Sequence, residues 1–168
     1  MGPVGHTVIS AGVGAGAWGV TQSVGAAALA FGVGVLMDAD HVYDYYHWYV
    51  KRRRDKIYVL LHAWEYSIAG LALALFLSHP LLLAAALGHL AHVITDQIHN
   101  RPSRFGYSIV YRAINGFEAE AISPGHSVGN SYVKLLRVIP FGQRLAQWFQ
   151  SRLAIPGDQV HICAQTTP

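Results

Sequence analysis

Cysteine and charged residues are both scarce in this sequence. Its 168 residues include one cysteine, Cys163, which excludes a disulfide framework and a thiolate metal site. Charged residues make up 12% of the chain, about half the share usual in soluble globular proteins. No Lys, Arg, Asp or Glu occurs in the first 37 residues, whereas hydrophobic residues make up 52% of the whole. This composition predicts a membrane protein in contact with the lipid bilayer. The net charge of +3 is spread over short segments, which gives no basic face for a nucleic acid.

The apolar residues form long runs that predict one all-α domain, a bundle of about four transmembrane helices. The runs cover residues 7–20, 24–37, 57–77 and 81–100, with turns at 21–23 and 78–80. Each of the first two runs is shorter than the roughly 20 residues that a span needs, so a single long helix over 7–37 is the alternative. Five Lys and Arg residues lie within 51–56 and indicate the cytoplasmic side. We therefore expect a multi-pass protein of the inner membrane, with both termini facing the cytoplasm.

Beyond the expected membrane-embedded domain, residues 1–100, the sequence becomes more polar. Residues 107–122 have an amphipathic pattern and predict a helix, as does the basic segment 132–153, which is broken at Pro140. We expect residues 101–154 to form cytoplasmic or interfacial amphipathic helices. The basic segment could lie in the membrane interface or pack on the rest of the protein. Residues 155–168 are expected to be a loose tail.

Four metal-ligand side chains fall within eleven residues of the fourth run. At about 100° per residue, His89, His92, Asp96 and His99 lie within an arc of about 80° on one face of a helix. Three imidazoles and a carboxylate on one stripe are costly to bury without a cation, and they suit Zn²⁺. This helix face is therefore the centre of the predicted site.

Four antiparallel spans would bring the other ionisable residues to the same end of the bundle. Ionisable groups at membrane depth are costly and usually mark function. Taken one by one, the same residues could be solvated, could cap helices, or could form local pairs. The predicted metal ligands are His6, Asp38, Asp40, His41, His62, Glu65, His89, His92 and Asp96.

The order of these short motifs resembles a known family. An N-terminal His6, then Asp38-x-Asp40-His41, then His62, then Gly88-x-x-x-His92-x-x-x-Asp96 is similar to the membrane-bound metal-dependent hydrolases, also described as LexA-binding, inner-membrane-associated hydrolases. The resemblance covers roughly residues 4–100 and implies these residues as the site, together with hydrolytic activity. It singles out His92 and Asp96 in the fourth run, which leaves His89 and His99 as candidates to bind a second metal or to orient the ligands of the first. The sequence departs from the family pattern at Met37 and at His62-Ala63-Trp64-Glu65, where Glu65 would replace a second histidine.

The predicted function is hydrolysis of an ester or phosphoester by metal-activated water at the cytoplasmic membrane face. Mixed His/Asp ligation favours Zn²⁺ and also admits Mn²⁺ or Fe²⁺. Glu65 or Asp38 would act as the general base, and the substrate would be a small molecule or a lipid. The alternatives are a metal transporter or sensor, a haem protein with paired histidines, and a non-catalytic membrane interaction protein.

Overall fold

The computed structural model describes residues 2–51, 53–125 and 142–153, which belong to two compact units. The first unit comprises Met1–Asp44 and Asp55–His126, and the second comprises Tyr45–Arg54 and Ser127–Pro168. Within the described ranges the regular structure is helical, apart from a single antiparallel bridge between Lys56 and Glu118. The all-α prediction is confirmed for this part of the chain.

The N-terminal run folds into a helical hairpin. Helix α1 spans Pro3–Thr21 and helix α2 spans Val24–Leu36. Gln22 between them has a left-handed backbone (φ 52°), and its N–H donates to the Trp18 carbonyl. The Ser23 hydroxyl then accepts the N–H of Ala26 and caps α2. The turn was predicted from residues 21–23, and the alternative of one long helix is wrong.

A second hairpin pairs α4 with α5. Helix α4 spans Trp64–Phe76 and helix α5 spans Pro80–Asn100. Proline stands in the first turn of α5, and the His79 ring Nδ1 accepts the N–H of Leu82 as an N-terminal cap. The predicted third run is wrong at its start, because residues 57–63 form an irregular loop instead of the first turns of a helix. The cause is a set of buried polar side chains that bind this loop, described below.

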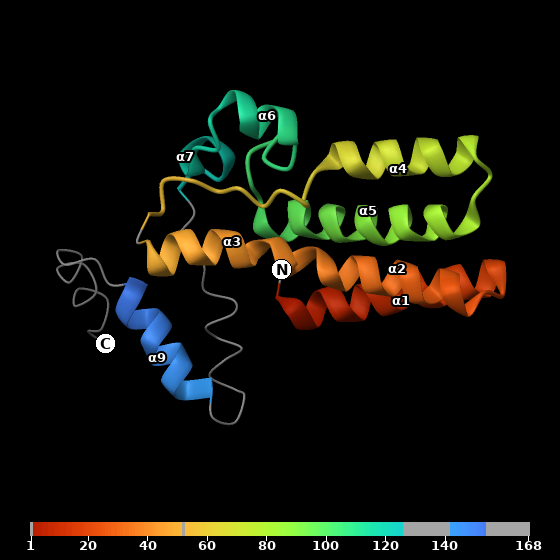
Figure 1. Ribbon diagram of the computed structural model, residues 1–168, viewed down its shortest axis with the longest axis horizontal. Helices are drawn as coiled ribbons and strands as arrows, with labels where there is room; N and C mark the ends of the chain where they lie inside the picture. The colour runs from red at the N-terminus through yellow and green to blue at the C-terminus, as the bar shows by residue number, and fades with distance from the viewer. Residues whose placement is uncertain (1, 52, 126–141, 154–168) are drawn as a thin grey trace, which may run out of the picture. The chain divides into compact units, whose positions relative to one another are not determined.

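The four long helices lie side by side, with the two hairpin turns at the same end (Figure 1). Helix α2 packs on both α1 and α5, and α4 packs on α5. Helices α2 and α5 approach so closely at Gly88 that a Cβ there would collide with the Ala30 backbone. Gly14 of α1 faces α2, where a Cβ would lie 3.0 Å from the Ala27 carbonyl oxygen, whereas a Cβ at Gly12 or Gly16 would meet nothing within 4 Å. Small residues therefore set the helix spacing.

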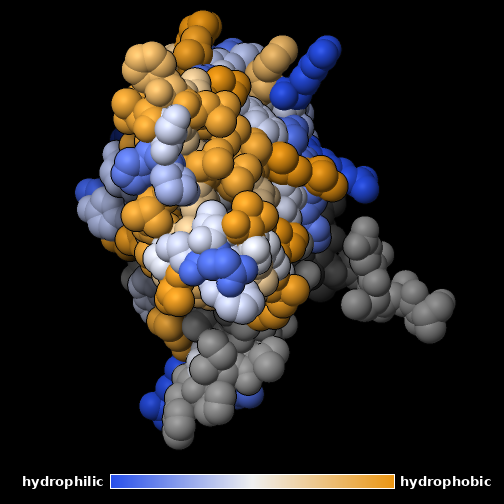
Figure 2. All heavy atoms as spheres, turned by 90° about the vertical axis from the view of Figure 1, so that its right-hand side faces the viewer, coloured by the Kyte–Doolittle hydropathy of each residue, from blue (hydrophilic) through white to orange (hydrophobic). Residues whose placement is uncertain are grey.

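Two helical stretches, Val24–Val50 and Pro80–Asn100, are long and apolar enough to cross a membrane. Helix α4, with 13 residues, is shorter than a usual span. The end of the bundle that carries both turns is viewed in Figure 2, where apolar side chains cover much of the surface. Val20, Val24 and Phe76 are among the most exposed apolar residues of the hairpins, at 87%, 75% and 85%. Exposed apolar surface of this kind is expected where lipid replaces water.

The remaining elements are short. The chain continues from α2 through the 3₁₀ turn η1 (Met37–Asp40), α3 (His41–Tyr45) and the π turn η2 (Tyr46–Val50). The helix predicted over 107–122 is instead two pieces, α6 (Ile109–Ile114) and α7 (Ala119–Ile122), because Gly116 and Phe117 adopt positive φ between them.

The basic segment 132–153 was predicted to be helical, and its described part, Gly142–Leu153, forms helix α9 of the second unit. Leu145 and Trp148 are exposed on this helix. The predicted break at Pro140, the rest of that segment and the predicted tail 155–168 lie outside the described residues.

Candidate metal centre

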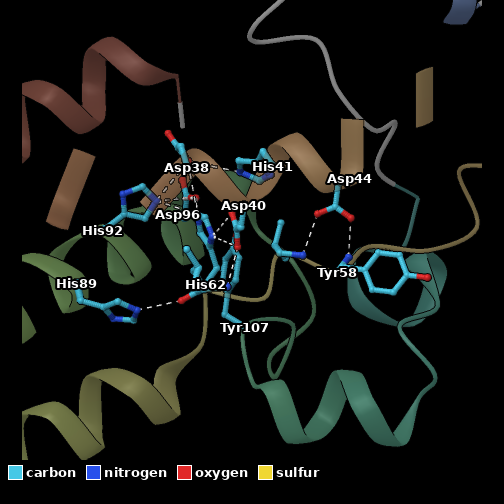
Figure 3. Close-up of polar contacts among 12 residues, drawn as sticks. Asp38, Asp40, His41, Asp44, Tyr58, His62, His89, His92, Asp96 and Tyr107 are labelled. Carbon is cyan, nitrogen blue, oxygen red and sulfur yellow. Dashed lines mark hydrogen bonds and ion pairs between the residues drawn. The ribbon is translucent and has the colours of Figure 1, made fainter. Parts of the chain in front are cut away.

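Six predicted ligands come together at the end of the bundle away from the hairpin turns. Figure 3 labels all of them except His6. They come from α1, η1, α3, the 57–63 loop and α5. The donors form two sets of four. Within each set, the four ligand atoms all lie within 4.8 Å of one another, and both sets include Asp38 and Asp96. His6 and His92 complete one set; His41 and His62 complete the other. Four side chains are buried, whereas Asp38 and His41 remain 15% and 19% exposed and form the open side of the cluster.

The His92 ring is fixed in the tautomer that ligates a metal through Nε2. Its Nδ1 lies 2.6 Å from the Gly34 carbonyl oxygen, which can only accept, so Nδ1 carries the hydrogen. The Nε2 lone pair then points into the cluster, 3.4 Å from Asp38 Oδ1. A backbone carbonyl that holds the far nitrogen is a common partner of metal-binding histidines.

His62 is held in the same way, but by a carboxylate. Its Nδ1 lies 3.2 Å from Asp40 Oδ2, so it donates to Asp40 and leaves the Nε2 lone pair toward the cluster. That Nε2 lies 2.9 Å from His92 Nε2 and 3.5 Å from both Asp38 and Asp96. Asp40 thus orients a ligand and is not among the six clustered donors, although it was predicted as a ligand itself.

His6 enters the cluster from α1. Its ring stacks on His92 with centroids 3.9 Å apart, and its Nε2 lies 2.9 Å from Asp96 Oδ1. The angles at this pair fall outside those of a hydrogen bond, so the buried Nε2 has an ionic neighbour and no hydrogen bond. A buried nitrogen without a hydrogen bond costs about 1–3 kcal/mol unless another partner binds it.

The carboxylates around His62 favour its protonated form. Burial lowers the pKa of His62, but hydrogen bonds to Asp38 and Asp40 outweigh burial and raise this pKa to about 9. In the metal-free protein a proton on His62 therefore balances one of the carboxylates. A divalent cation at the same place would balance them better, so the donor set fits a metal.

The loop that presents His62 is bound by carboxylates from the preceding segment. Asp44 is fully buried, and its two oxygens accept the N–H groups of Tyr58 and Val59 at 2.7 and 2.8 Å. Asp40 accepts the N–H of Leu61 at 2.7 Å. Val59 adopts a positive φ of 34°, which a valine avoids unless its surroundings impose it. These bonds hold the loop out of the helical conformation that its apolar sequence would otherwise favour.

The carbonyl groups of the same loop bind Arg112 and His89. Arg112 is fully buried on α6, and its guanidinium donates to the carbonyls of Tyr58, Val59 and His62 at 2.6–2.7 Å. His89 Nε2 donates to the Leu61 carbonyl at 3.0 Å, while its Nδ1 faces the Ser67 hydroxyl at 2.6 Å. Both His89 nitrogens are thus used, and His89, predicted as a ligand or as a supporting group, supports the loop that presents His62.

Glu65 also lies apart from the cluster. Its carboxylate accepts from the Ser108 hydroxyl at 2.5 Å and from the backbone N–H groups of Ile109 and Val110 at 3.1 and 3.3 Å. These groups form the N-terminus of α6, where a carboxylate is stabilised by the helix dipole and by unpaired N–H donors. The predicted roles of Glu65 as ligand and general base therefore do not fit its position.

Three buried residues that contribute to the site were not predicted: Asp44, Tyr107 and Arg112. Tyr107 stacks on His62 with centroids 5.9 Å apart, and its hydroxyl accepts from the Asn100 side chain. Arg112 carries a detectable signal, since it is the one cation within an otherwise apolar stretch, 109–114. His99, on the predicted helix face, is exposed and is not one of the six donors.

His62 and His92 cannot be the two axial ligands of a haem. An iron porphyrin held by two axial histidines needs room for the macrocycle between the two imidazoles. His62 and His92 are 2.9 Å apart at Nε2, with ring centroids 4.8 Å apart, so no macrocycle fits between them.

The chain matches no known family model, no curated protein and no solved structure. The family resemblance of the short motifs therefore stays a prediction, and what the structure itself provides is an all-α fold with a buried His/Asp cluster able to hold a metal ion.

Proposed function

We propose that this protein is a membrane-bound metal-dependent hydrolase of the kind its motifs resemble, acting on an ester or phosphoester at the cytoplasmic membrane face. The observation that supports the proposal best is the convergence of six His and Asp donors, from four separate stretches of sequence, at one largely buried point. Side chains of this kind are rarely buried together without a partner. Zn²⁺ is the ion that the donor set suits best, with Mn²⁺ or Fe²⁺ as alternatives.

The residues of the chain have distinct parts in this proposal. A bound ion supplies a water of lowered pKa and polarises the scissile bond. His92 and His62 ligate through Nε2 because Gly34 and Asp40 occupy their other nitrogens. Asp38, the more exposed of the two clustered carboxylates, would hold the ion at the open side of the cluster, where a substrate would reach it. Glu65 has no part in the reaction, since α6 occupies its carboxylate.

The proposed membrane location is supported by the placement of the cluster. The cluster lies at one end of the bundle, and the opposite end exposes apolar residues such as Val20 and Phe76. Helix α2, between the two ends, contains no ionisable residue. A transporter needs polar groups along its path, and this helix supplies none, so the hydrolase is the better proposal.

The test combines metal analysis with a substrate panel. We expect the protein purified in detergent to contain stoichiometric metal and to hydrolyse at least one of a set of phosphomonoesters, phosphodiesters and carboxylic esters. Asp96→Ala should abolish both, whereas His99→Ala, outside the cluster, should leave both unchanged. A folded preparation with only traces of metal after incubation with Zn²⁺ would refute the proposal, as would activity that survives in Asp96→Ala. Metal uptake into liposomes containing the protein would favour the transporter.

A further inference from the structure

The six clustered donors are too many for one tetrahedral ion, and they divide into two sets. Zinc in proteins binds four ligands at about 2.0–2.2 Å. One set is His6, His92, Asp38 and Asp96, and the other is His41, His62, Asp38 and Asp96. Each set has two imidazoles of its own, and both share the same two carboxylates. This sharing requires each carboxylate to face both pairs of histidines.

Asp38 meets this requirement through a single oxygen. Its Oδ1 lies 3.4 Å from His92 Nε2, in the first set, and 3.5 Å from the Nε2 atoms of both His41 and His62, in the second. An oxygen between two sets of imidazole nitrogens is placed to bridge two cations. No single pair of histidines accounts for its position.

Asp96 meets the requirement through two oxygens. Its Oδ1 lies 2.9 Å from His6 Nε2, whereas its Oδ2 lies 3.5 Å from His62 Nε2 and 3.6 Å from His92 Nε2. The two oxygens thus face different parts of the cluster, which is how a carboxylate binds one cation with each oxygen. The buried His6 Nε2, which has no hydrogen bond, also points into this cluster.

We propose that the cluster holds two divalent transition-metal ions, with His6 and His92 on one, His41 and His62 on the other, and Asp38 and Asp96 shared by both. Shared carboxylates hold such ions about 3.5–4 Å apart, as in two-metal phosphatases and nucleases. The inference rests on the proposed function only for the role of the metals in hydrolysis.

Charge bears on the class of substrate. Asp38 and Asp96, the two shared carboxylates, carry two negative charges when ionised, and neutral imidazoles add none. Two divalent ions would therefore leave a net positive charge near the open side formed by Asp38 and His41. A net positive centre attracts anions, so phosphoesters are the ester class that a two-ion centre favours.

The experiment counts ions in the full-length protein purified in detergent. After chelation and reconstitution with Zn²⁺, we expect two ions per chain by mass spectrometry of the metal. Reconstitution with Mn²⁺ should give an exchange-coupled electron paramagnetic resonance spectrum, with hyperfine spacing half that of isolated Mn²⁺. Saturation at one ion per chain, or a spectrum of two uncoupled ions, would overturn the inference.

Variants then assign the ligands. His6→Gln and His41→Gln each remove a donor from one set only, so each should lower the count from two ions to one. Asp96→Asn alters a shared ligand and should weaken both ions, whereas His99→Ala should keep two. Two ions retained in either His6→Gln or His41→Gln would refute the assignment, and should a variant not fold, the wild-type count and spectrum decide.

The outcomes separate this inference from the proposed function. One ion per chain with hydrolysis that depends on Asp96 would overturn the pair of ions and leave the hydrolase. Two coupled ions without hydrolysis of any ester would overturn the hydrolase and leave the pair.

Discussion

Replacement of Gly88 by alanine tests whether close packing of two helices holds the site together. In α5, a Cβ at Gly88 would lie 2.9 Å from the carbonyl carbon and 3.0 Å from the Cα of Ala30, and closer still to its carbonyl oxygen. Ordinary contacts of this kind are 3.4–4 Å. Because Ala30 is fully buried and the atoms that collide are backbone, α2 and α5 must separate by about 1 Å.

This separation would act directly on the candidate metal centre. Four residues after Gly88 on α5 stands His92, and four residues after Ala30 on α2 stands Gly34, the acceptor of the 2.6 Å bond from His92 Nδ1. A further 1 Å takes that pair beyond hydrogen-bonding distance. Overpacking costs about 1–3 kcal/mol and the lost bond about 0.5–1.5 kcal/mol, offset by about 1 kcal/mol from better helix propensity. We expect Gly88→Ala to lower the free energy of unfolding by about 1–3 kcal/mol.

The assay is reversible unfolding in mixed detergent micelles, together with titration of Zn²⁺ into the metal-free protein. Loss of the Gly34 contact should weaken zinc binding roughly 10- to 100-fold, as for other groups that orient a ligand. Gly32→Ala on α2 is the matched control, because a Cβ there meets nothing within 4 Å and should leave zinc binding unchanged. If Gly88→Ala unfolds and binds zinc as Gly32→Ala does, the reasoning about this helix contact is wrong.

Three other predictions concern the loop and its neighbours. Arg112→Met should lower the free energy of unfolding by several kcal/mol, because about 1–3 kcal/mol is lost for each buried carbonyl left unpaired; chemical denaturation measures this, and an unchanged midpoint would contradict the role of Arg112. Asp38 and Asp40 raise the pKa of His62 to about 9 in the folded protein, so protonation of His62 stabilises the metal-free fold. This contribution to the free energy of unfolding, up to about 3 kcal/mol, is complete below about pH 6.5 and is lost as the pH rises through 9. Unfolding of the metal-free protein from pH 6 to 10 tests this, and His62→Gln should remove that part of the pH dependence. Glu65→Gln should lower stability by about 0.5–2 kcal/mol through its cap on α6 and leave the metal count unchanged; loss of metal in the folded variant would restore Glu65 as a ligand.

The N-terminal part of the fold could be predicted from sequence because its signals are local. Thr21-Gln22-Ser23 between two apolar runs predicts a hairpin, and Ser23 is a good N-cap. The loop 57–63 could not be predicted, because its residues are mostly apolar and its partners Asp44 and Arg112 lie 14–15 and 50–54 positions away. Only the folded chain brings these charges to the loop. The dipeptide Asn115-Gly116 is typical of a turn and indicates the observed break, but the amphipathic pattern of 107–122 favoured one continuous helix.

The candidate site was predictable in its location but not in the roles of its members. Topology alone places His6, Asp38 and His62 near α5, since alternate ends of antiparallel helices meet. Spacing, however, does not distinguish a ligand from a group that supports one. His89 and Asp96 share a helix face, yet seven residues at 1.5 Å each separate them by about 10 Å along the axis, which exceeds the ligand sphere of one ion. Likewise, the His62-x-x-Glu65 spacing suits two ligands of one metal ion. His62, however, lies at the end of the 57–63 loop and bonds Asp40, whereas Glu65 lies at the start of α4 and bonds Ser108.

The division between ligands and supporting groups follows from the cost of buried charge. Asp44 and Arg112 carry opposite charges, and both form hydrogen bonds to backbone groups of the 57–63 loop. These bonds stabilise the two buried charges without a metal ion. Asp38 differs, because its ion-pair partners are His41, His62 and His92, and a histidine balances a carboxylate only when protonated. The same fold therefore contains two kinds of buried polar cluster: one that is complete without a metal and fixes the loop, and one that requires protons or metal ions. The first is what allows the second to keep its geometry in the absence of metal, because His62 is positioned by backbone bonds that do not depend on what occupies the centre.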